Sequence, residues 1–200
     1  MKLVFATSNP NKIKEVAEIL SKNLTFQIIP MSELGLVEEI PETSPTIEGN
    51  ALQKARYLHD RFNVNCFAED TGLEIESLNG EPGVLSARYA GEEKNAAANM
   101  NLVLKNLSTK GNRRARFRTV IALIINDKEY TFEGIIEGKI DHKKSGKGGF
   151  GYDPIFIPEG FDQSFGILDA SIKNKISHRG KAMAKLVAFL NKSPNQDSDS

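Results

Sequence analysis

The fold is decided by residues 116–140, RFRTVIALIINDKEYTFEGIIEGKI, which have the pattern of two long strands joined by a two-residue turn. The segments Arg116–Ile125 and Glu129–Ile140 are rich in β-branched and aromatic residues, and Asn126-Asp127 suits a tight turn. Gly134 and Gly138 lie within the second segment and indicate bulges or close approaches of other chain segments. The stretch therefore predicts a long antiparallel hairpin.

Apolar segments on both sides of the hairpin predict further strands and helices. Strands are expected at about 2–6, 25–29, 65–68, 73–76 and 155–157, and helices at about 10–20, 46–61, 95–107 and from 177 onward. Strands and helices mix without strict alternation, and the hairpin is antiparallel. The sequence therefore predicts an α/β fold with a mixed sheet flanked by helices.

The composition indicates one globular domain of an intracellular protein. The chain has 200 residues, and we expect a domain over 1–190 and a polar, disordered tail over 191–200. Its 26 basic and 26 acidic residues balance, which argues against a general binder of nucleic acids or membranes. Cys66 is the one cysteine, which suits a reducing compartment. We expect neither a membrane span nor a signal peptide, and a cytoplasmic location.

A lysine has an unusual position at the start of the first expected helix. Asn9 is a suitable N-cap and Pro10 a suitable first residue, so Lys12 is third, facing the positive end of the helix dipole. An anion bound by free helix N–H groups would offset that cost. The segment Thr7-Ser8-Asn9-Pro10-Asn11-Lys12 therefore predicts a phosphate site. The alternative is a surface lysine on a fraying first turn.

Two adjacent acids, Glu69 and Asp70, follow the strand expected at 65–68. Ligands gather at strand ends in α/β proteins, and Mg²⁺ prefers carboxylate oxygens, so the pair predicts a metal–phosphate site. Neighbouring strand residues point to opposite faces, so both acids reach one ion only if the strand ends there. An Asx turn at Asp70 is the alternative. Asp70-Thr71-Gly72 occurs once, which excludes an aspartic protease, because that chemistry needs two such carboxylates.

The glycine-rich segment 146–154 carries Phe150 and Tyr152. Aromatic faces beside exposed backbone groups could stack a nucleobase and bind its edge. A mobile surface hairpin is the alternative.

Ser177-His178-Arg179 begins the last expected helix, and Lys173 lies just upstream. Cations again lie at a helix start, where an anion would be favourable. His178 alone would more often be an ordinary histidine, and no second ligand at metal spacing supports zinc. The basic run at 113–118 could contact nucleic acid, but we favour arginines on an exposed strand face with Phe117 and Thr119 on the other.

Five motifs together resemble, in order and spacing, those of the Ham1-like family of inosine triphosphatases. They are Thr7–Lys12, Ala68–Leu73, Pro82–Tyr89, Gly149–Pro154 and Ile176–Gly180, within a match over residues 1 to about 190. The resemblance implies an elongated sheet and two lobes around a nucleotide cleft. It also implies a homodimer that uses Mg²⁺ to hydrolyse ITP, dITP and XTP to the monophosphate and pyrophosphate, cleansing the nucleotide pool.

The resemblance implies roles for individual residues. Asp70 would accept a proton and bind the metal, Lys12 would assist catalysis, and Glu42 would be a metal ligand beside Asp70 and Glu69. The substrate would be bound by Thr7, Ser8, Asn9, Pro10, Asn11, Lys12, Thr71, Phe150, Gly151, Tyr152, Asp153, Lys173, His178 and Arg179. Many members have Asp-Asp-Ser-Gly at residues 69–72 and an acid at 49, where this chain has glycine.

Two other functions fit parts of the pattern. One is a Maf-like nucleotide pyrophosphatase that acts on pyrimidine or methylated nucleotides. The other is a non-enzymatic nucleotide- or RNA-binding module that uses Phe150, Tyr152 and the basic run. Product analysis with Mg²⁺ and several nucleotides would separate these functions.

Overall fold

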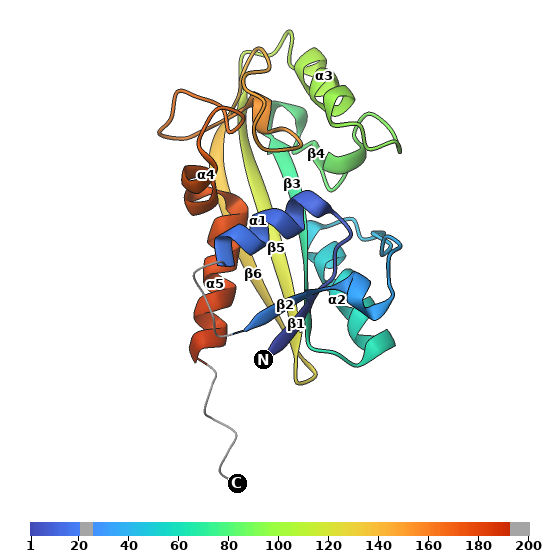
Figure 1. Ribbon diagram of the computed structural model, residues 1–200. Coiled ribbons are helices and arrows are strands. Elements are labelled where there is room, and N and C mark those ends of the chain that lie inside the picture. The colour runs from blue at the N-terminus through green and yellow to red at the C-terminus, as the bar shows by residue number, and fades with distance from the viewer. Residues whose placement is uncertain (21–25, 193–200) are drawn as a thin grey trace.

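A long mixed sheet forms the centre of the computed structural model, which describes residues 1–20 and 26–192 (Figure 1). The strand order is β2-β1-β3-β5-β6-β7, with β4 paired to β3. β1 is parallel to β2 and β3, and the other pairings are antiparallel. The predicted α/β fold is confirmed. The strands are β1 (Lys2–Phe5), β2 (Gln27–Pro30), β3 (Cys66–Ile75), β4 (Pro82–Gly83), β5 (Arg114–Ile125), β6 (Lys128–Ile140) and β7 (Phe156–Pro158).

The β5–β6 hairpin forms as predicted. The strands pair without interruption, and Asn126 and Asp127 have φ of 50° and 59°, as a type I′ turn requires. Gly134 and Gly138 mark places where another segment approaches the strand closely, and neither is a bulge. A Cβ on Gly134 would lie 2.0 Å from the carbonyl oxygen of His178, and one on Gly138 would lie 2.3 Å from that of Ile157.

The described residues contain helices α1 (Pro10–Leu20), α2 (Ile47–Phe62), α3 (Ala96–Asn106), α4 (Ala170–Ile176) and α5 (His178–Lys192). The expected starts of α1, α2 and α3 are confirmed by capping hydrogen bonds. The Asn9 carboxamide oxygen accepts from the N–H groups of Asn11 and Lys12, at 3.0 and 3.4 Å. Thr46 and Asn95 cap α2 and α3 in the same way. None of these helices has both the length and the apolar character needed to cross a membrane.

Three apolar clusters cover the sheet. α2 packs on one face of β3 and β5, around Ala51, Ala55 and Leu58. α5 and α1 cover the opposite face at the same end of the sheet, around Phe67 and Ile121. α3 and the glycine-rich segment cover that face at the far end of the strands. The site described below lies between the first and third clusters, which both contribute apolar residues to its lining.

The arginines of the basic run on β5 lie on an exposed strand face, as the sequence analysis favoured. Arg116 forms an ion pair with Glu74 at 2.6 Å, and Arg118 pairs with Glu133. Phe117 and Thr119 are buried on the other face. The arginines therefore neutralise neighbouring acids on the sheet.

Two predicted boundaries are wrong. The strand expected at 65–68 does not end before Glu69. Instead, β3 continues to Ile75, because β5 pairs with it from Cys66 to Ile75 and outweighs the local turn signal. The last helix also continues through Lys192, so the predicted tail begins too early. Residues 193–200, and Thr25 of the strand expected at 25–29, lie outside the described residues.

α4 is not among the helices predicted from the sequence. Its cap is nevertheless visible in the sequence, because Asp169 precedes it and its side chain accepts from the N–H of Ser171 at 2.8 Å. A seven-residue helix has too few turns to show a clear apolar period.

Candidate functional site

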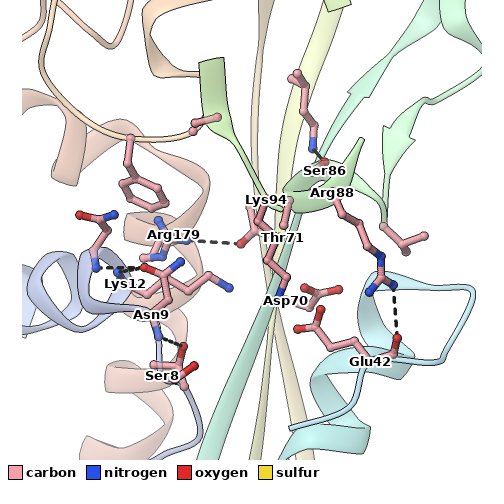
Figure 2. Close-up of a pocket in the computed structure, with 18 of the residues that line it drawn as sticks. Ser8, Asn9, Lys12, Glu42, Asp70, Thr71, Ser86, Arg88, Lys94 and Arg179 are labelled. Atoms are coloured by element: carbon pink, nitrogen blue, oxygen red, sulfur yellow. Dashed lines mark hydrogen bonds between the residues drawn. The ribbon is translucent and has the colours of Figure 1, made fainter. Parts of the chain in front are cut away.

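A pocket of about 920 Å³ lies at an open edge of β3 (Figure 2). β1 pairs with β3 only as far as Phe67, and β4 pairs with it only from Leu73. Between these points the edge of β3 faces the pocket, so residues from both sheet faces can reach it. This volume is in the range of sites for small organic ligands.

The pocket brings together almost all of the predicted site residues. Pro10 and Glu69 are the two that do not line it. Those that do are Thr7, Ser8, Asn9, Asn11, Lys12, Glu42, Asp70, Thr71, Phe150, Gly151, Tyr152, Asp153, Lys173, His178 and Arg179.

Lys12 is half-buried and directed toward the sheet. Its ammonium lies 3.4 Å from the carboxylate of Glu69, and burial lowers its pKa despite that acid. The alternative of a fraying surface lysine is therefore wrong. The first N–H groups of α1 were expected to be free, but those of Asn11 and Lys12 donate to the side chain of Asn9. The ammonium and the hydroxyls of the loop remain to bind an anion.

Glu69 points away from Asp70, because β3 continues through both residues. The expectation that the two acids share one ion is therefore wrong. Arg179 donates to both carboxylate oxygens of Glu69, at 2.8 and 2.9 Å. Burial alone would raise the pKa of Glu69, but the charges of Arg179 and Lys12 lower it to about 2. Glu69 is thus a buried counter-ion of Arg179.

Glu15 on α1 extends this buried ion cluster, and the sequence analysis missed it. Its carboxylate pairs with Arg179 and lies 2.6 Å from the ammonium of Lys173, which also bonds Asp153 at 2.7 Å. The cluster joins α1, α4, α5 and the glycine-rich segment. The available signal was spacing, because Glu15 follows Lys12 by three residues and so lies on the same side of the helix.

Asp70 lies on the α2 side of β3. The Asn50 carboxamide donates to it at 3.3 Å, and the Lys54 ammonium lies 3.6 Å away and also pairs with Glu42. Burial raises the pKa of Asp70, against the effect of Lys54 and Lys12. The expected alternative of an Asx turn is wrong, because Asp70 lies within a strand. Asn50 and Lys54 were missed, although polar residues four apart among the buried apolar positions of α2 are a usable signal.

The carboxylates of Asp70 and Glu42 both lie within 4.0 Å of one ammonium, that of Lys54. Burial alone would raise the pKa of Glu42, but the charge and hydrogen bond of Lys54 lower it overall. Two carboxylates suit Mg²⁺, which usually completes its shell with waters and substrate phosphates. In the described parts of the chain, no three His, Cys, Asp or Glu side chains form a ready-made metal cluster.

The glycine-rich segment is held in place by hydrogen bonds, in contrast to the mobile hairpin considered as an alternative. Asp153 accepts from the N–H of Phe150 at 2.7 Å, and the Tyr152 hydroxyl donates to the carbonyl of Ser86 at 2.8 Å. The ring of Phe150 lies 5.0 Å from the Lys173 ammonium and 5.4 Å from the Arg179 guanidinium. Cations therefore lie beside an aromatic face at this end of the pocket.

His178 is buried and stacks on Phe117, with ring centroids 4.6 Å apart. Burial, reinforced by the charges of Arg179 and Lys173, holds its pKa well below the usual value, so the ring is neutral. Its Nδ1 has no hydrogen-bond partner among residues 1–20 and 26–192. A buried, unpaired ring nitrogen in a pocket wall is suited to bind a polar edge of a ligand.

The pocket therefore has two chemically different ends. Figure 2 shows Lys12 and Arg179 on one side, Glu42 and Arg88 on the other, and Asp70 between them. An aromatic ring, a neutral imidazole and paired cations suit a heterocycle at one end. The cations around Asp70, a carboxylate with a raised pKa, suit a polyphosphate and a proton transfer.

Comparison with known proteins agrees with this chemistry. The model of the Ham1 family matches residues 3–189. A dITP/XTP pyrophosphatase of Flavobacterium johnsoniae is 53% identical, over 95% of this chain and 98% of its own. One from Bacillus subtilis is 45% identical, over 94% and 96%.

Solved structures show the same fold. A HAM1 protein from Coxiella burnetii has a TM-score of 0.89 at 37% identity and covers 96% of this chain and 100% of its own. The Staphylococcus aureus Ham1 protein has a TM-score of 0.86 at 38% identity, with 96% and 99% covered.

Proposed function

The chain belongs to the Ham1 family, and from that membership we propose that it is a nucleoside triphosphate pyrophosphatase. Its substrates are the non-canonical purine nucleotides dITP, ITP and XTP, and its products are the nucleoside monophosphate and pyrophosphate. The proposal draws on the names of its relatives and on the chemistry of the pocket.

The observation that carries the proposal is the position of Asp70 at the open edge of β3, beside Lys54. Burial raises the pKa of this carboxyl group, which makes its ionised form a stronger base. Asp70 takes a proton from the water that attacks the α-phosphorus. The bond between that phosphorus and the α–β bridging oxygen then breaks, and the electron pair leaves with pyrophosphate.

The leaving pyrophosphate gains negative charge, which cations in the pocket stabilise. The Lys54 ammonium lies 3.6 Å from Asp70, and the charges of both Lys54 and Lys12 lower the pKa of this carboxyl group. Thr7 and Ser8 add hydroxyl groups at the same wall. Preorganised charges of this kind lower the barrier because they need no reorganisation when the bond breaks.

We propose that Asp70 and Glu42 also bind a divalent metal ion, Mg²⁺. The two carboxylates already flank one cation, the ammonium of Lys54, and their number fits the few protein ligands that Mg²⁺ takes. When bound, Mg²⁺ neutralises charge on the phosphate oxygens. We leave Glu69 out of this metal site because Arg179 occupies both of its oxygens.

The part of the pocket beside Phe150 binds the purine. Phe150 supplies an aromatic face, and His178 and Arg179 supply polar groups at the base edge. Donors in this position favour a 6-oxo purine, because the amino group of adenine leaves them unpaired. A site built around such a hydrogen bond can reject the mismatched base by about 10⁴-fold.

We further propose that the enzyme is a cytoplasmic homodimer and that the two ends of the sheet act as lobes around the nucleotide. These proposals rest on the family resemblance. Size-exclusion chromatography with light scattering tests the dimer, and scattering with and without nucleotide tests lobe closure.

Product analysis tests the main proposal. The protein is incubated with Mg²⁺ and dITP, XTP, dUTP, GTP or ATP, and the products are separated. We expect monophosphate and pyrophosphate from dITP and XTP. Diphosphate and phosphate would indicate an ordinary NTPase, preference for dUTP would favour the Maf-like alternative, and no product would favour a binding module.

A further inference from the structure

Arg88 differs from the other cations of the pocket in having no acidic partner. Lys12, Lys54, Lys94, Lys173 and Arg179 each lie within 4.0 Å of a carboxylate. Within the described residues, no carboxylate lies that close to the guanidinium of Arg88, which also lines the pocket. An uncompensated guanidinium in a pocket wall favours an anionic ligand, and its planar donors match phosphate oxygens.

The backbone that carries Arg88 is held firmly. The Ser86 hydroxyl donates to the carbonyl of Gly83 at 2.6 Å and accepts from the N–H of Leu73 on β3 at 2.8 Å. The Asn99 carboxamide donates to the carbonyl of Ala87 at 2.9 Å. These groups are buried or partly buried, so Arg88 starts from a fixed base and only its own side chain has to be ordered by a ligand.

The present contact of Arg88 is weak. Its guanidinium donates to the carbonyl oxygen of Glu42 at 3.4 Å (Figure 2). That distance is longer than an ordinary hydrogen bond and much longer than a charge-assisted one. A phosphate oxygen would therefore replace this partner at little cost.

We propose that Arg88 binds the phosphate chain of the nucleotide from the wall opposite Lys12. Asp70 lies between Lys12 and Arg88, so the two cations would bind the phosphates from both sides of the α-phosphorus that reacts. The Tyr152 hydroxyl donates to the carbonyl of Ser86, two residues before Arg88. The segment that binds the base thus also supports the residue that binds phosphate. This inference rests on the proposed function.

The test uses Arg88→Gln, which keeps an N–H donor for the carbonyl of Glu42 and removes the charge. We expect KM for XTP to rise about tenfold to hundredfold, as for loss of a charged hydrogen bond. Inhibition by inorganic triphosphate should weaken similarly, and inhibition by the nucleoside xanthosine should stay within about twofold. Arg88→Lys should recover part of the loss.

Arg114→Ala is the matched control, because Arg114 is an exposed arginine on β5 outside this pocket. This variant should leave KM for XTP and the inhibition constants of inorganic triphosphate and xanthosine unchanged. Wild-type values in Arg88→Gln, or an equal loss of xanthosine and triphosphate binding, would overturn the inference. If the wild type fails to hydrolyse XTP, the proposed function is wrong. Binding of inorganic triphosphate to wild type and Arg88→Gln would then still decide the role of Arg88.

Discussion

At the scale of single residues, the direction of a side chain decides its chemistry. Glu69 and Asp70 are neighbours in sequence, yet Glu69 neutralises Arg179 and Asp70 lies beside Lys54. The difference follows from the alternation of side chains along a strand that continues through both residues. One acid is therefore structural, and the other is the proposed base.

Asp70→Asn should abolish turnover and leave nucleotide binding in place. The amide has nearly the same size as the carboxylate but cannot take a proton, so we expect kcat to fall by about 10²–10⁴-fold or more. Steady-state kinetics on XTP and calorimetric binding of XTP measure the two effects. Asp60→Asn, an exposed acid on α2, is the control. A near wild-type kcat in Asp70→Asn would remove Asp70 from the mechanism.

His178 should make the folded state sensitive to mild acid. The folded protein keeps the ring neutral, whereas the unfolded chain takes up a proton below its ordinary pKa of about 6.5. The contribution is complete above that pH and declines as pH falls, by about 1.4 kcal/mol at pH 5.5. Urea unfolding of wild type and His178→Phe, which keeps a stacking ring, measures the two slopes. Equal pH slopes would contradict the prediction.

Local signals explain which residues could be predicted. Asn9, Thr46 and Asn95 cap helices through bonds to residues two or three positions away, so their roles are visible in the sequence. The positions of Glu15 and Lys54 on their helices are weaker signals, because the ion pairs that these residues form are with residues distant in the sequence. The loops of the candidate pocket and most of its charged residues were thus predicted, whereas Glu15 and Lys54, which pair with those residues, were not.

At the scale of elements, Gly134 determines how closely α5 approaches the sheet. A Cβ on this residue would lie 2.0 Å from the carbonyl oxygen of His178 and 2.6 Å from the nitrogen of Ala182. The first turn of α5 carries His178 and Arg179 into the pocket. The absence of one methyl group on β6 therefore helps to place that wall of the site.

Gly134→Ala should destabilise the fold and lower activity together. Forcing a methyl group into this contact should cost about 1–3 kcal/mol of unfolding free energy. It should also lower kcat/KM for XTP, because α5 must move away from β6. Gly111→Ala is the control, since a Cβ there meets no atom within 4 Å. Unchanged denaturant midpoints for both variants would show that the contact is easily relieved.

Pairing between distant strands explains the errors at this scale. Asp70-Thr71-Gly72 has the composition of a turn, yet β5 pairs with all of it and extends the strand. The hairpin of β5 and β6 was predictable because its partners are adjacent in sequence. The extent of β3 was not predictable, because its partner strand β5 lies some fifty residues further along the chain.

At the scale of the whole molecule, the pocket is lined by residues of two apolar clusters, the one under α2 and the one under α3 at the other end of the sheet. A ligand bound there contacts both ends and should stabilise the complete fold. With the metal withheld, XTP at about 100 times its dissociation constant should add about 2.7 kcal/mol to the unfolding free energy. Thermal melting measures this effect, and ATP at the same concentration should raise Tm less. Equal shifts would show that the pocket does not distinguish the bases.

The pairing of β1 with β3 also has a consequence for the order of folding. β5 and β6 join across a two-residue turn and can form early, whereas β1 meets β3 only when residue 4 reaches residue 66. Until that happens, Lys12 has no place beside the sheet. An intermediate with a formed hairpin should thus be inactive, and activity should recover last during refolding. Dissociation of β1 from β3 should inactivate the enzyme before the rest of the sheet unfolds.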